Sequence, residues 1–216
     1  MTEVFPQPQH AEVPTVAVTA GPAVAAELLD VLDNKGRPTG EALPRGEVHR
    51  RGLWHRSVQT WVFAQRGAQL LLQRRAAHKE SCPDMWDVSS AGHVTTGCSS
   101  LHTAQLEMEE ELGLSLPASA YQWLFLDIFQ SGQGGTYIDN EFSDVYLVTV
   151  PEPLPPSAFT LDESEVAEVK WMPWRDYEAI LRSRDPRYVP FDVQTPNGYG
   201  QLLFSHLAKI SALGGG

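Results

Sequence analysis

Cysteine is nearly absent from this sequence, and no hydrophobic run is long. Its two cysteines, Cys82 and Cys98, offer neither a disulfide framework nor a Cys-x-x-Cys metal pair, so a reducing compartment is expected. No apolar run approaches the roughly 18 residues that a membrane-spanning helix needs. The first 25 residues have no basic segment before an apolar one, so secretion is not indicated, and they lack arginine, which is one mark of an organelle transit peptide. We therefore expect a cytoplasmic protein that does not enter membranes.

Positive charge is also scarce. Sixteen Lys and Arg residues against 27 Asp and Glu residues give a net charge of −11. A broad basic surface that binds nucleic acid is therefore not expected. An acidic protein can still bind a phosphorylated molecule when a divalent cation supplies the local positive charge.

The length and composition fit one globular domain with a leader segment. At 216 residues, 42% hydrophobic and 20% charged, the chain has the usual composition of a soluble domain. Residues 1–25 are rich in Pro, Ala and Val without a sustained period, and we expect a flexible leader there, apart from a short β segment that residues 15–18 could form. Residues 26–212 are expected to form the domain.

Strands and helices are predicted to alternate along this domain. Residue alternation and turn residues predict strands at 27–33, 57–63, 69–75, near 86–90, 121–129, 142–150 and 166–172. Helical periodicity predicts helices at 99–112, 174–183 and 197–211. Residues 37–54 are polar and interrupted by Gly and Pro, which favours a long loop or a loose hairpin. This order indicates an α+β domain with a mixed sheet and helices on both faces.

The best-marked helix is expected at residues 99–112. Ser99 or Ser100 can cap its start, and Gly113 can close its end. Its apolar residues recur at helical spacing and predict one buried face: Leu101, Ala104, Met108 and Leu112.

The same helix carries glutamates at positions 107, 109, 110 and 111. An acidic run on a helix is usually a solvated surface. Here Glu107 and Glu111 are four residues apart and Glu110 lies on the same side, so three carboxylates can converge although like charges at this spacing repel. A divalent cation would relieve that repulsion, because it prefers hard oxygen ligands. We therefore interpret this helix as a candidate cation site.

Residues 92–114 follow a recognisable order of glycines, glutamates and aliphatic residues. Seven positions carry the pattern at the right spacing: Gly92, Glu107, Met108, Glu110, Glu111, Gly113 and Leu114. The stretch resembles the Nudix box, in which glycine, five residues, glutamate, seven residues and Arg-Glu precede an aliphatic residue, Glu-Glu, glycine and a final aliphatic residue. The resemblance implies a Nudix fold, an α/β/α sandwich with a mixed central sheet. It also implies hydrolysis of a diphosphate bond that depends on Mg²⁺, with Mn²⁺ as an alternative.

The resemblance also implies roles for the acidic residues. Glu107 and Glu111 would bind the metal ion, and Glu110 would be a further ligand or the base that activates water. Two positions depart from the pattern, since Cys98 replaces an acid and Leu106 replaces the arginine that orients the acidic cluster in the family. Without that positive neighbour the carboxylates should repel one another more and hold protons more readily. Weaker metal binding or slower turnover is therefore expected.

The resemblance extends from about residue 27 to residue 205. Segments such as PRGEVHRRGLWHRSVQTWVF and NEFSDVYLV are similar to the isopentenyl-diphosphate-isomerase-like branch of the Nudix superfamily, and above all to its plant and algal hydrolases. Isomerases of this branch bind a metal through three histidines and two acids. The matching positions imply a possible second metal site: His49, His55, His93, Asp139 and Glu141. The isomerase also needs a cysteine directly before the Gly-His pair, where this chain has Ala91, so hydrolysis at phosphorus is favoured over isomerisation at carbon.

Three basic residues are candidates for contacts to a diphosphate. Arg75 and Lys79 match positions that grip the diphosphate in this branch, and Arg45 is a third candidate. Taken alone, they would indicate solvated loop charges. The expected ligand is a small-molecule diphosphate, either an isoprenoid diphosphate or a nucleoside-diphosphate derivative. Two alternatives stay open, a non-catalytic diphosphate-binding domain and, less favoured, an isomerase.

Overall fold

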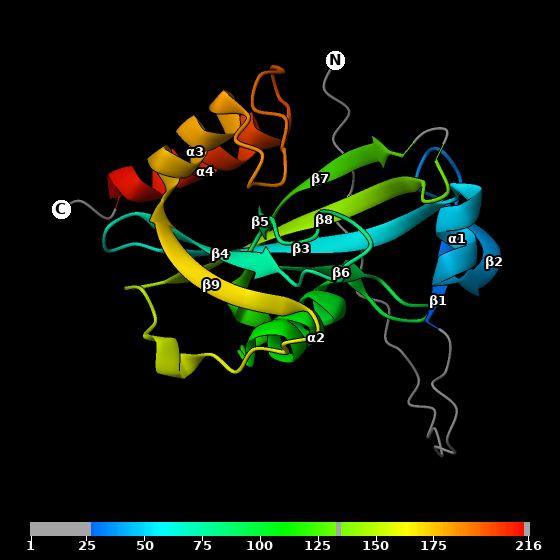
Figure 1. Ribbon diagram of the computed structural model, residues 1–216, viewed down its shortest axis with the longest axis horizontal. Coiled ribbons are helices and arrows are strands. Elements are labelled where there is room, and N and C mark those ends of the chain that lie inside the picture. Colours follow the sequence, from blue (N-terminus) through cyan, green and yellow to red (C-terminus); the bar gives the residue numbers. More distant parts are fainter. Residues whose placement is uncertain (1–26, 133–134, 214–216) are drawn as a thin grey trace.

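The computed structural model describes residues 27–132 and 135–213, so the leader expected at 1–25 lies outside the described residues, as does its β segment at 15–18. Figure 1 shows the elements in chain order: β1 (Leu28–Leu32), β2 (Pro38–Pro44), α1 (Arg45–Arg51), β3 (Trp54–Ala64), β4 (Gln69–Arg75), β5 (Trp86–Asp87), β6 (Ser90–His93), α2 (Ser100–Leu112), β7 (Tyr121–Ser131), β8 (Asp139–Val150), β9 (Val166–Pro173), α3 (Trp174–Ser183) and α4 (Tyr199–Leu213). Within this part of the chain, no helix combines the length and apolar character needed to cross a membrane.

Strand β3 lies at the centre of the sheet. It pairs in parallel with β8 along its whole length, and β8 pairs antiparallel with β7. The other edge of β3 is shared by β1, β6 and β4, all antiparallel to it. Strand β4 pairs in turn with β5 and β9. The mixed sheet expected from the sequence is therefore confirmed.

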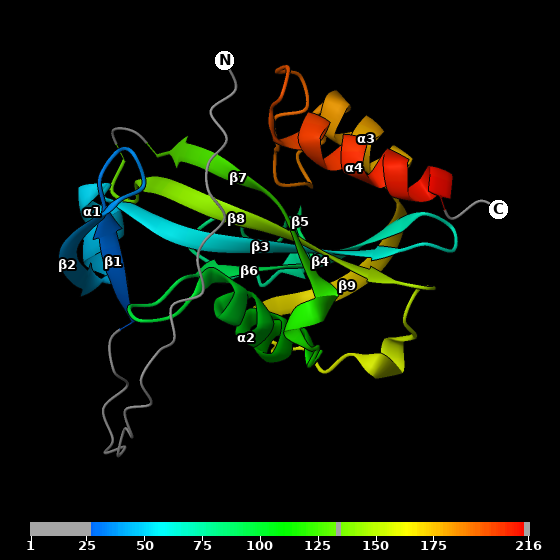
Figure 2. The same cartoon turned by 180° about the vertical axis from the view of Figure 1, so that it is seen from behind.

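Helices cover both faces of this sheet. Figures 1 and 2 show α2 on one face and the α3–α4 pair on the other. Successive side chains of a strand point to opposite faces, and β3 accordingly serves two cores. Val58 and Val62 pack on the α2 side with Met108, whereas Trp61 and Phe63 pack on the α3–α4 side. The expected α/β/α sandwich is confirmed.

The prediction of a loop or loose hairpin over residues 37–54 is wrong in part. Strand β2 does form a hairpin with β1, but residues Arg45–Arg51 form helix α1. This helix has seven residues, and only Val48 and His49 are buried, so it shows no apolar stripe that a sequence pattern could reveal. A helix this short depends on tertiary contacts for its stability.

The single strand expected near residues 86–90 is also corrected. The structure has two short strands there, β5 and β6, and β6 extends past the predicted strand to Gly92 and His93. A glycine in such a position is unfavourable for a strand unless another group approaches its backbone closely. At Gly92 the carboxylate of Glu107 makes this close approach.

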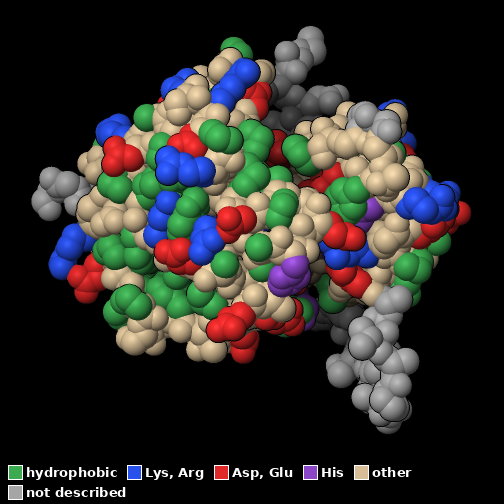
Figure 3. All heavy atoms as spheres, in the orientation of Figure 1, with side chains coloured by type: hydrophobic (Ala, Val, Ile, Leu, Met, Phe, Trp, Pro, Cys, Tyr) green, Lys and Arg blue, Asp and Glu red, His purple; other side chains and the backbone are tan. Residues whose placement is uncertain are grey.

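Figure 3 shows Asp and Glu side chains interspersed with Lys and Arg over the face in view. That face carries no broad basic surface in the part that the structure describes, as the net charge of −11 leads one to expect.

Candidate active site and metal centre

Helix α2 holds its carboxylates in a fixed position. Ser99 caps its start, since Ser99 Oγ accepts a backbone N–H of the first turn at 3.3 Å. Gly113 ends it in the left-handed conformation, with φ at 72°. The expected apolar stripe packs against the sheet, with three residues buried and one partly buried: Ala104, Met108, Leu112 and Leu101.

Glu107 lies against Gly92 of β6. Gly92 pairs with Val58, whose side chain packs on the α2 side of the sheet. A Cβ atom at position 92 would lie 2.0 Å from Glu107 Oε1. The missing side chain of Gly92 therefore lets the Glu107 carboxylate reach β6 itself.

Glu111 is the buried member of the acidic group, with 5% of its surface exposed. Its Oε2 accepts the backbone N–H of Ala91 at 3.2 Å and the side-chain amide of Gln73 at 3.5 Å. Ala91 belongs to β6 and Gln73 to β4. The carboxylate of Glu111 therefore lies between these two strands.

Burial and neighbouring negative charges raise the pKa values of Glu107 and Glu111. Burial raises the pKa of Glu107 to about 8, and the neighbouring charges of Glu111 and Glu110 contribute to the rise. Burial also raises the pKa of Glu111 to about 7, although its hydrogen bonds oppose the rise. Glu110 itself is exposed. A divalent cation would neutralise this local excess of negative charge, so the donor set fits a metal ion with oxygen ligands.

Gly92→Ala is expected to weaken Mn²⁺ binding by roughly 10- to 100-fold, the usual cost of disturbing the support of a metal ligand. The added methyl group would displace the end of the Glu107 side chain, which is flexible, so the fold should survive. Calorimetric titration with Mn²⁺ measures the effect. Gly46→Ala is the matched control, because a Cβ atom there meets nothing within 4 Å. Equal Mn²⁺ affinity in both variants would contradict this account of Gly92.

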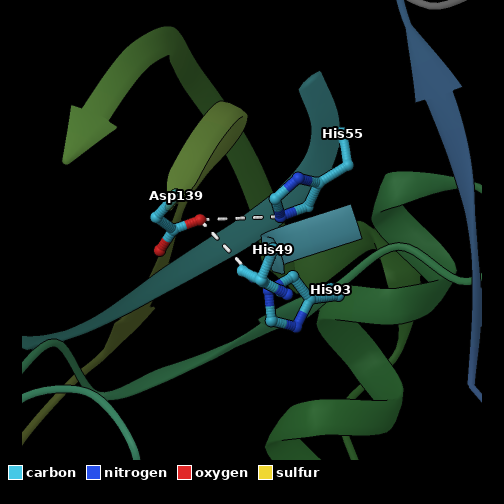
Figure 4. A group of neighbouring side chains, drawn as sticks. All are labelled: His49, His55, His93 and Asp139. Atoms are coloured by element: carbon cyan, nitrogen blue, oxygen red, sulfur yellow. Dashed lines mark ion pairs between the residues drawn. The ribbon is translucent and has the colours of Figure 1, made fainter. Parts of the chain in front are cut away.

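A second cluster gathers residues that the sequence analysis expects to bind metal (Figure 4). His49 comes from α1, His55 from β3, His93 from the end of β6 and Asp139 from the start of β8. Their potential ligand atoms all lie within 4.8 Å of one another. Asp139 Oδ1 is 3.6 Å from Nε2 of His49 and equally far from Nε2 of His55. Four separate elements thus meet at one point.

Hydrogen bonds from His49 and His55 to the backbone determine which ring nitrogen of each faces this cluster. Nδ1 of His49 lies 2.8 Å from the carbonyl oxygen of Arg45, and Nδ1 of His55 lies 3.0 Å from that of Leu53. A carbonyl only accepts, so Nδ1 carries the hydrogen and Nε2 of the neutral ring keeps a lone pair. Both Nε2 atoms and Asp139 Oδ1 are buried without a hydrogen-bond partner among the described residues. Such atoms are rare in folded proteins, and facing one another they fit a divalent cation.

Glu141 completes the expected set of five. It lies beside His55 in the β3–β8 register, and its Oε1 is 3.6 Å from Nε2 of His55 and 3.4 Å from Nε2 of His93. Its Oε2 accepts hydrogen bonds from Ser57 and Ser143 at 2.9 and 3.2 Å. Burial by itself would raise the pKa of Glu141, but when His55 and His93 are protonated, as they can be without a metal ion, their hydrogen bonds and charge hold this pKa well below its usual value. The carboxylate is therefore charged and oriented toward the histidines.

Glu27 connects the two clusters, and it is not among the residues predicted for the site. Its Oε1 lies 3.8 Å from Nδ1 of His93, and its Oε2 lies 3.8 Å from Nε of Arg45. Its charge also contributes to the raised pKa of Glu107, after burial and the nearer glutamates. Glu27 precedes β1, which touches the segment after β6 through an isolated bridge. The backbone N–H of Arg45 also donates to the carbonyl oxygen of Glu27 at 2.9 Å. Tertiary contacts of this kind bring Glu27 to the site, and no local sequence pattern marks it.

The three basic residues expected to contact a diphosphate all have protein partners, and the partner of Arg45 is Glu27. Arg75 donates from Nε to the carbonyl oxygen of Ser81 at 3.0 Å and from Nη1 to Asp87 at 3.3 Å. Lys79 forms an ion pair with Glu165. Arg75 therefore holds the loop that follows β4, whereas Lys79 is tied to a single carboxylate.

Arg45, the third of these basic residues, lines a cavity of about 470 Å³ beside the histidine cluster. This is the size range of small-molecule sites. Six of its lining residues carry charged or aromatic side chains: Glu27, Arg45, His49, Arg50, Glu80 and Tyr137. Tyr137 stacks on the ring of His49, with 4.4 Å between the centroids. A molecule that enters this cavity meets the guanidinium group of Arg45 and the edge of the histidine cluster.

Comparison with known proteins gives matches over most of the domain. A family model described as "NUDIX domain" matches residues 53–191. "Nudix hydrolase 3" of Arabidopsis thaliana is 49% identical over 181 residues, which cover 83% of this chain but 23% of that protein. The isopentenyl-diphosphate Delta-isomerase of Dinoroseobacter shibae is 31% identical over 160 residues, which cover 74% of this chain and 85% of the isomerase.

Two further matches cover nearly the whole of the proteins concerned. An uncharacterized Nudix hydrolase of Listeria monocytogenes is 31% identical over 162 residues, 75% of this chain and 88% of its own. A protein of Deinococcus radiodurans with a known crystal structure aligns with a TM-score of 0.58 at 22% identity, over 73% of this chain and 90% of that protein. The last match supports the fold alone.

Proposed function

Because this chain belongs to the Nudix hydrolase family, we propose that it hydrolyses a diphosphate bond in a small molecule and that it uses Mg²⁺ or Mn²⁺ bound by α2. The observation that carries the proposal is a pair of carboxylates on α2, of which Glu111 is buried and Glu107 is partly buried. Glu107 and Glu111 converge beside β6, and burial raises the pKa of both. Side chains arranged in this way favour a divalent cation over water as their neighbour.

Each residue of the site has a task in this proposal. A bound Mg²⁺ would lower the pKa of a water molecule and neutralise charge that develops on the diphosphate. Glu107 and Glu111 would hold the ion, and the exposed carboxylate of Glu110 would accept the proton of the attacking water or add a ligand. Lys79 and Arg45 would bind diphosphate oxygens. Arg75 would keep the loop of Lys79 in place through its bonds to the protein.

The histidine cluster is proposed as a second metal site. Three imidazole nitrogens and two carboxylates are a donor set for a divalent transition metal more than for Mg²⁺, which prefers oxygen ligands alone. Because the cluster borders the cavity lined by Arg45, a metal ion there would lie next to a bound diphosphate. The organic group of the substrate stays open between an isoprenoid chain and a nucleoside.

A panel of diphosphates tests the proposed function. Phosphate release is measured with Mg²⁺, with Mn²⁺ and with EDTA, for isopentenyl, dimethylallyl and longer isoprenoid diphosphates and for nucleoside-diphosphate derivatives. Metal-dependent release from at least one of them is expected, and the pattern of rates reports the substrate class. Binding without release in every case would favour a non-catalytic diphosphate-binding domain instead.

An isomerase is the second candidate, because the histidine cluster corresponds to the metal ligands of the isomerase branch. Ala91 argues against it, since a methyl group cannot transfer a proton where that reaction needs a cysteine. The test is deuterium uptake from solvent into isopentenyl diphosphate. Uptake above a control without enzyme would replace hydrolysis by isomerisation, and its absence would leave hydrolysis as the better proposal.

Leu106→Arg is expected to raise metal affinity or turnover severalfold. Leu106 is 37% exposed and stands where the family has an arginine beside the acidic cluster. A positive charge there should reduce the repulsion among the carboxylates and lower their pKa. Initial rates and Mn²⁺ titrations compare the variant with Leu106→Gln, which removes the apolar side chain without adding charge. If the two variants behave alike, the missing arginine does not limit this site.

A further inference from the structure

Lys79 and Glu165 form an ion pair next to the acidic helix, and their side chains are 21% and 40% exposed. The carbonyl oxygen of Glu165 accepts the backbone N–H of Ala76 at 2.9 Å, which fixes Glu165 at the end of β4. The segment just before it contacts the last turn of α2, where the N–H of Asp162 donates to the carbonyl oxygen of Glu111 at 3.2 Å. The ion pair therefore lies between the end of β4 and α2.

The charge of Glu165 acts on the same carboxylates as the proposed metal ion. After burial and nearer groups, it contributes to the raised pKa of both Glu107 and Glu111. Lys79 is the basic group in contact with it, and this lysine is also a candidate contact for the diphosphate. Glu165 and the diphosphate of the substrate would thus compete for the ammonium group of Lys79.

We propose that Lys79 and Glu165 form an exchangeable pair that couples cation binding to substrate binding. This inference rests on the proposed hydrolase function. In the substrate-free protein, the ammonium group of Lys79 is paired with the carboxylate of Glu165. A diphosphate offers stronger acceptors to the same group. When Lys79 turns to the diphosphate, Glu165 becomes free to bind a divalent cation together with Glu107 and Glu111. Glu165 is then a positioning residue for Lys79 before substrate binds and a metal ligand afterwards.

Calorimetric titration of the substrate-free protein with Mn²⁺ tests the exchange. Lys79→Met removes the competing ammonium group, so Mn²⁺ is expected to bind roughly fivefold more tightly or better, as the loss of one nearby like charge predicts. In the double variant Lys79→Met/Glu165→Gln this gain should vanish, because the carboxylate that the lysine masks is gone. Partly exposed ion pairs add little stability, so all variants are expected to fold.

The controls remove equal charges elsewhere. Lys209→Met takes an exposed lysine from α4, and Glu163→Gln takes an exposed acid two residues before Glu165. Neither should change Mn²⁺ affinity by more than the experimental error. Methylene diphosphonate, which is not hydrolysed, should tighten Mn²⁺ binding more in the wild type and in Glu163→Gln than in Glu165→Gln.

Three results would overturn the exchange: unchanged or weaker Mn²⁺ binding in Lys79→Met, a gain that persists in the double variant, or an equal effect of methylene diphosphonate on wild type and Glu165→Gln. These results are distinct from failure of the proposed function. Metal-dependent phosphate release by a protein whose Lys79→Met variant shows no gain would reject the exchange and keep the hydrolase.

Discussion

Glu111→Gln is expected to slow diphosphate hydrolysis by roughly 10³-fold or more, which corresponds to about 4 kcal/mol of lost transition-state stabilisation. Glutamine keeps the shape of the side chain and can still accept the N–H of Ala91, a bond that spans 3.2 Å in the wild type. It lacks the charge that a divalent cation needs. The loss should therefore appear in turnover and in Mn²⁺ affinity, while the fold is retained.

The same substitution is expected to stabilise the metal-free protein at alkaline pH. Burial raises the pKa of Glu111 to about 7 from an ordinary value of 4.5. A carboxyl with a raised folded-state pKa stabilises the fold below its unfolded-state pKa, and this contribution is lost as the pH rises through the folded-state pKa. In EDTA the free energy of unfolding of the wild type should therefore fall by on the order of 3 kcal/mol between about pH 4.5 and 8 because of this group. The glutamine variant has no such proton to lose.

Opposite signs for activity and stability make this prediction specific. Initial rates are measured with Mg²⁺, and urea unfolding is measured in EDTA at pH 6 and pH 9. Glu109→Gln is the control, because Glu109 lies on the same helix but is exposed. A Glu111→Gln enzyme that keeps a tenth of the wild-type rate, or that unfolds more easily than the wild type at pH 9, would contradict the role given to Glu111.

The acidic helix could be predicted because all of its signals are local. The cap at Ser99, the left-handed end at Gly113 and the apolar stripe lie within 15 residues of one another in the sequence. The spacing of Glu107 and Glu111 follows from the helix alone. What the sequence could not reveal is how differently the glutamates are buried, because that depends on β4 and β6, against which the helix packs.

Other parts of the site depend on contacts between distant segments. Glu27 and Glu165 lie beside the acidic helix, yet they precede β1 and β9, and neither belongs to a motif. The sequence does not predict the partners of Arg75 either, because Ser81 and Asp87 become its neighbours only when the loop after β4 folds back. Helix α1 escaped detection because its seven residues bury too little surface to leave a periodic pattern. The sequence therefore predicts residues that belong to local motifs, but not residues that reach the site through contacts between distant segments.

The histidine cluster shows what the structure adds to a resemblance. The sequence identifies the three histidines and two acids only because their positions match the metal ligands of the isomerase branch. Their relation in space depends on α1, β3, β6 and β8 meeting at one end of the sheet. Hydrogen bonds to backbone carbonyl groups orient His49 and His55 so that their Nε2 atoms face Asp139, and these Nε2 atoms have no hydrogen-bond partner among the described residues. A donor set so arranged should hold a metal ion through purification.

We expect the purified protein to retain about one equivalent of a divalent transition metal, such as Zn²⁺ or Mn²⁺, after dialysis. Removing it with a chelator should lower the melting temperature by roughly 5–10 °C, because a ligand present at 100 times its Kd stabilises the fold by about 2.7 kcal/mol. His55→Gln should abolish retention, since His55 is fully buried and lies within reach of both Asp139 and Glu141. Elemental analysis gives the metal content, and thermal unfolding with and without chelator gives the shift.

His206→Gln is the matched control for this prediction. Nδ1 of His206 also lies close to a backbone carbonyl, that of Leu202 at 2.9 Å, but the residue belongs to α4 and lies outside the cluster. This variant should keep its metal and its response to the chelator. Acidification should release the metal, because protons compete with it for the same imidazole lone pairs. If His55→Gln retains as much metal as His206→Gln, or if the chelator leaves the melting temperature of the wild type unchanged, the five residues do not form a metal site.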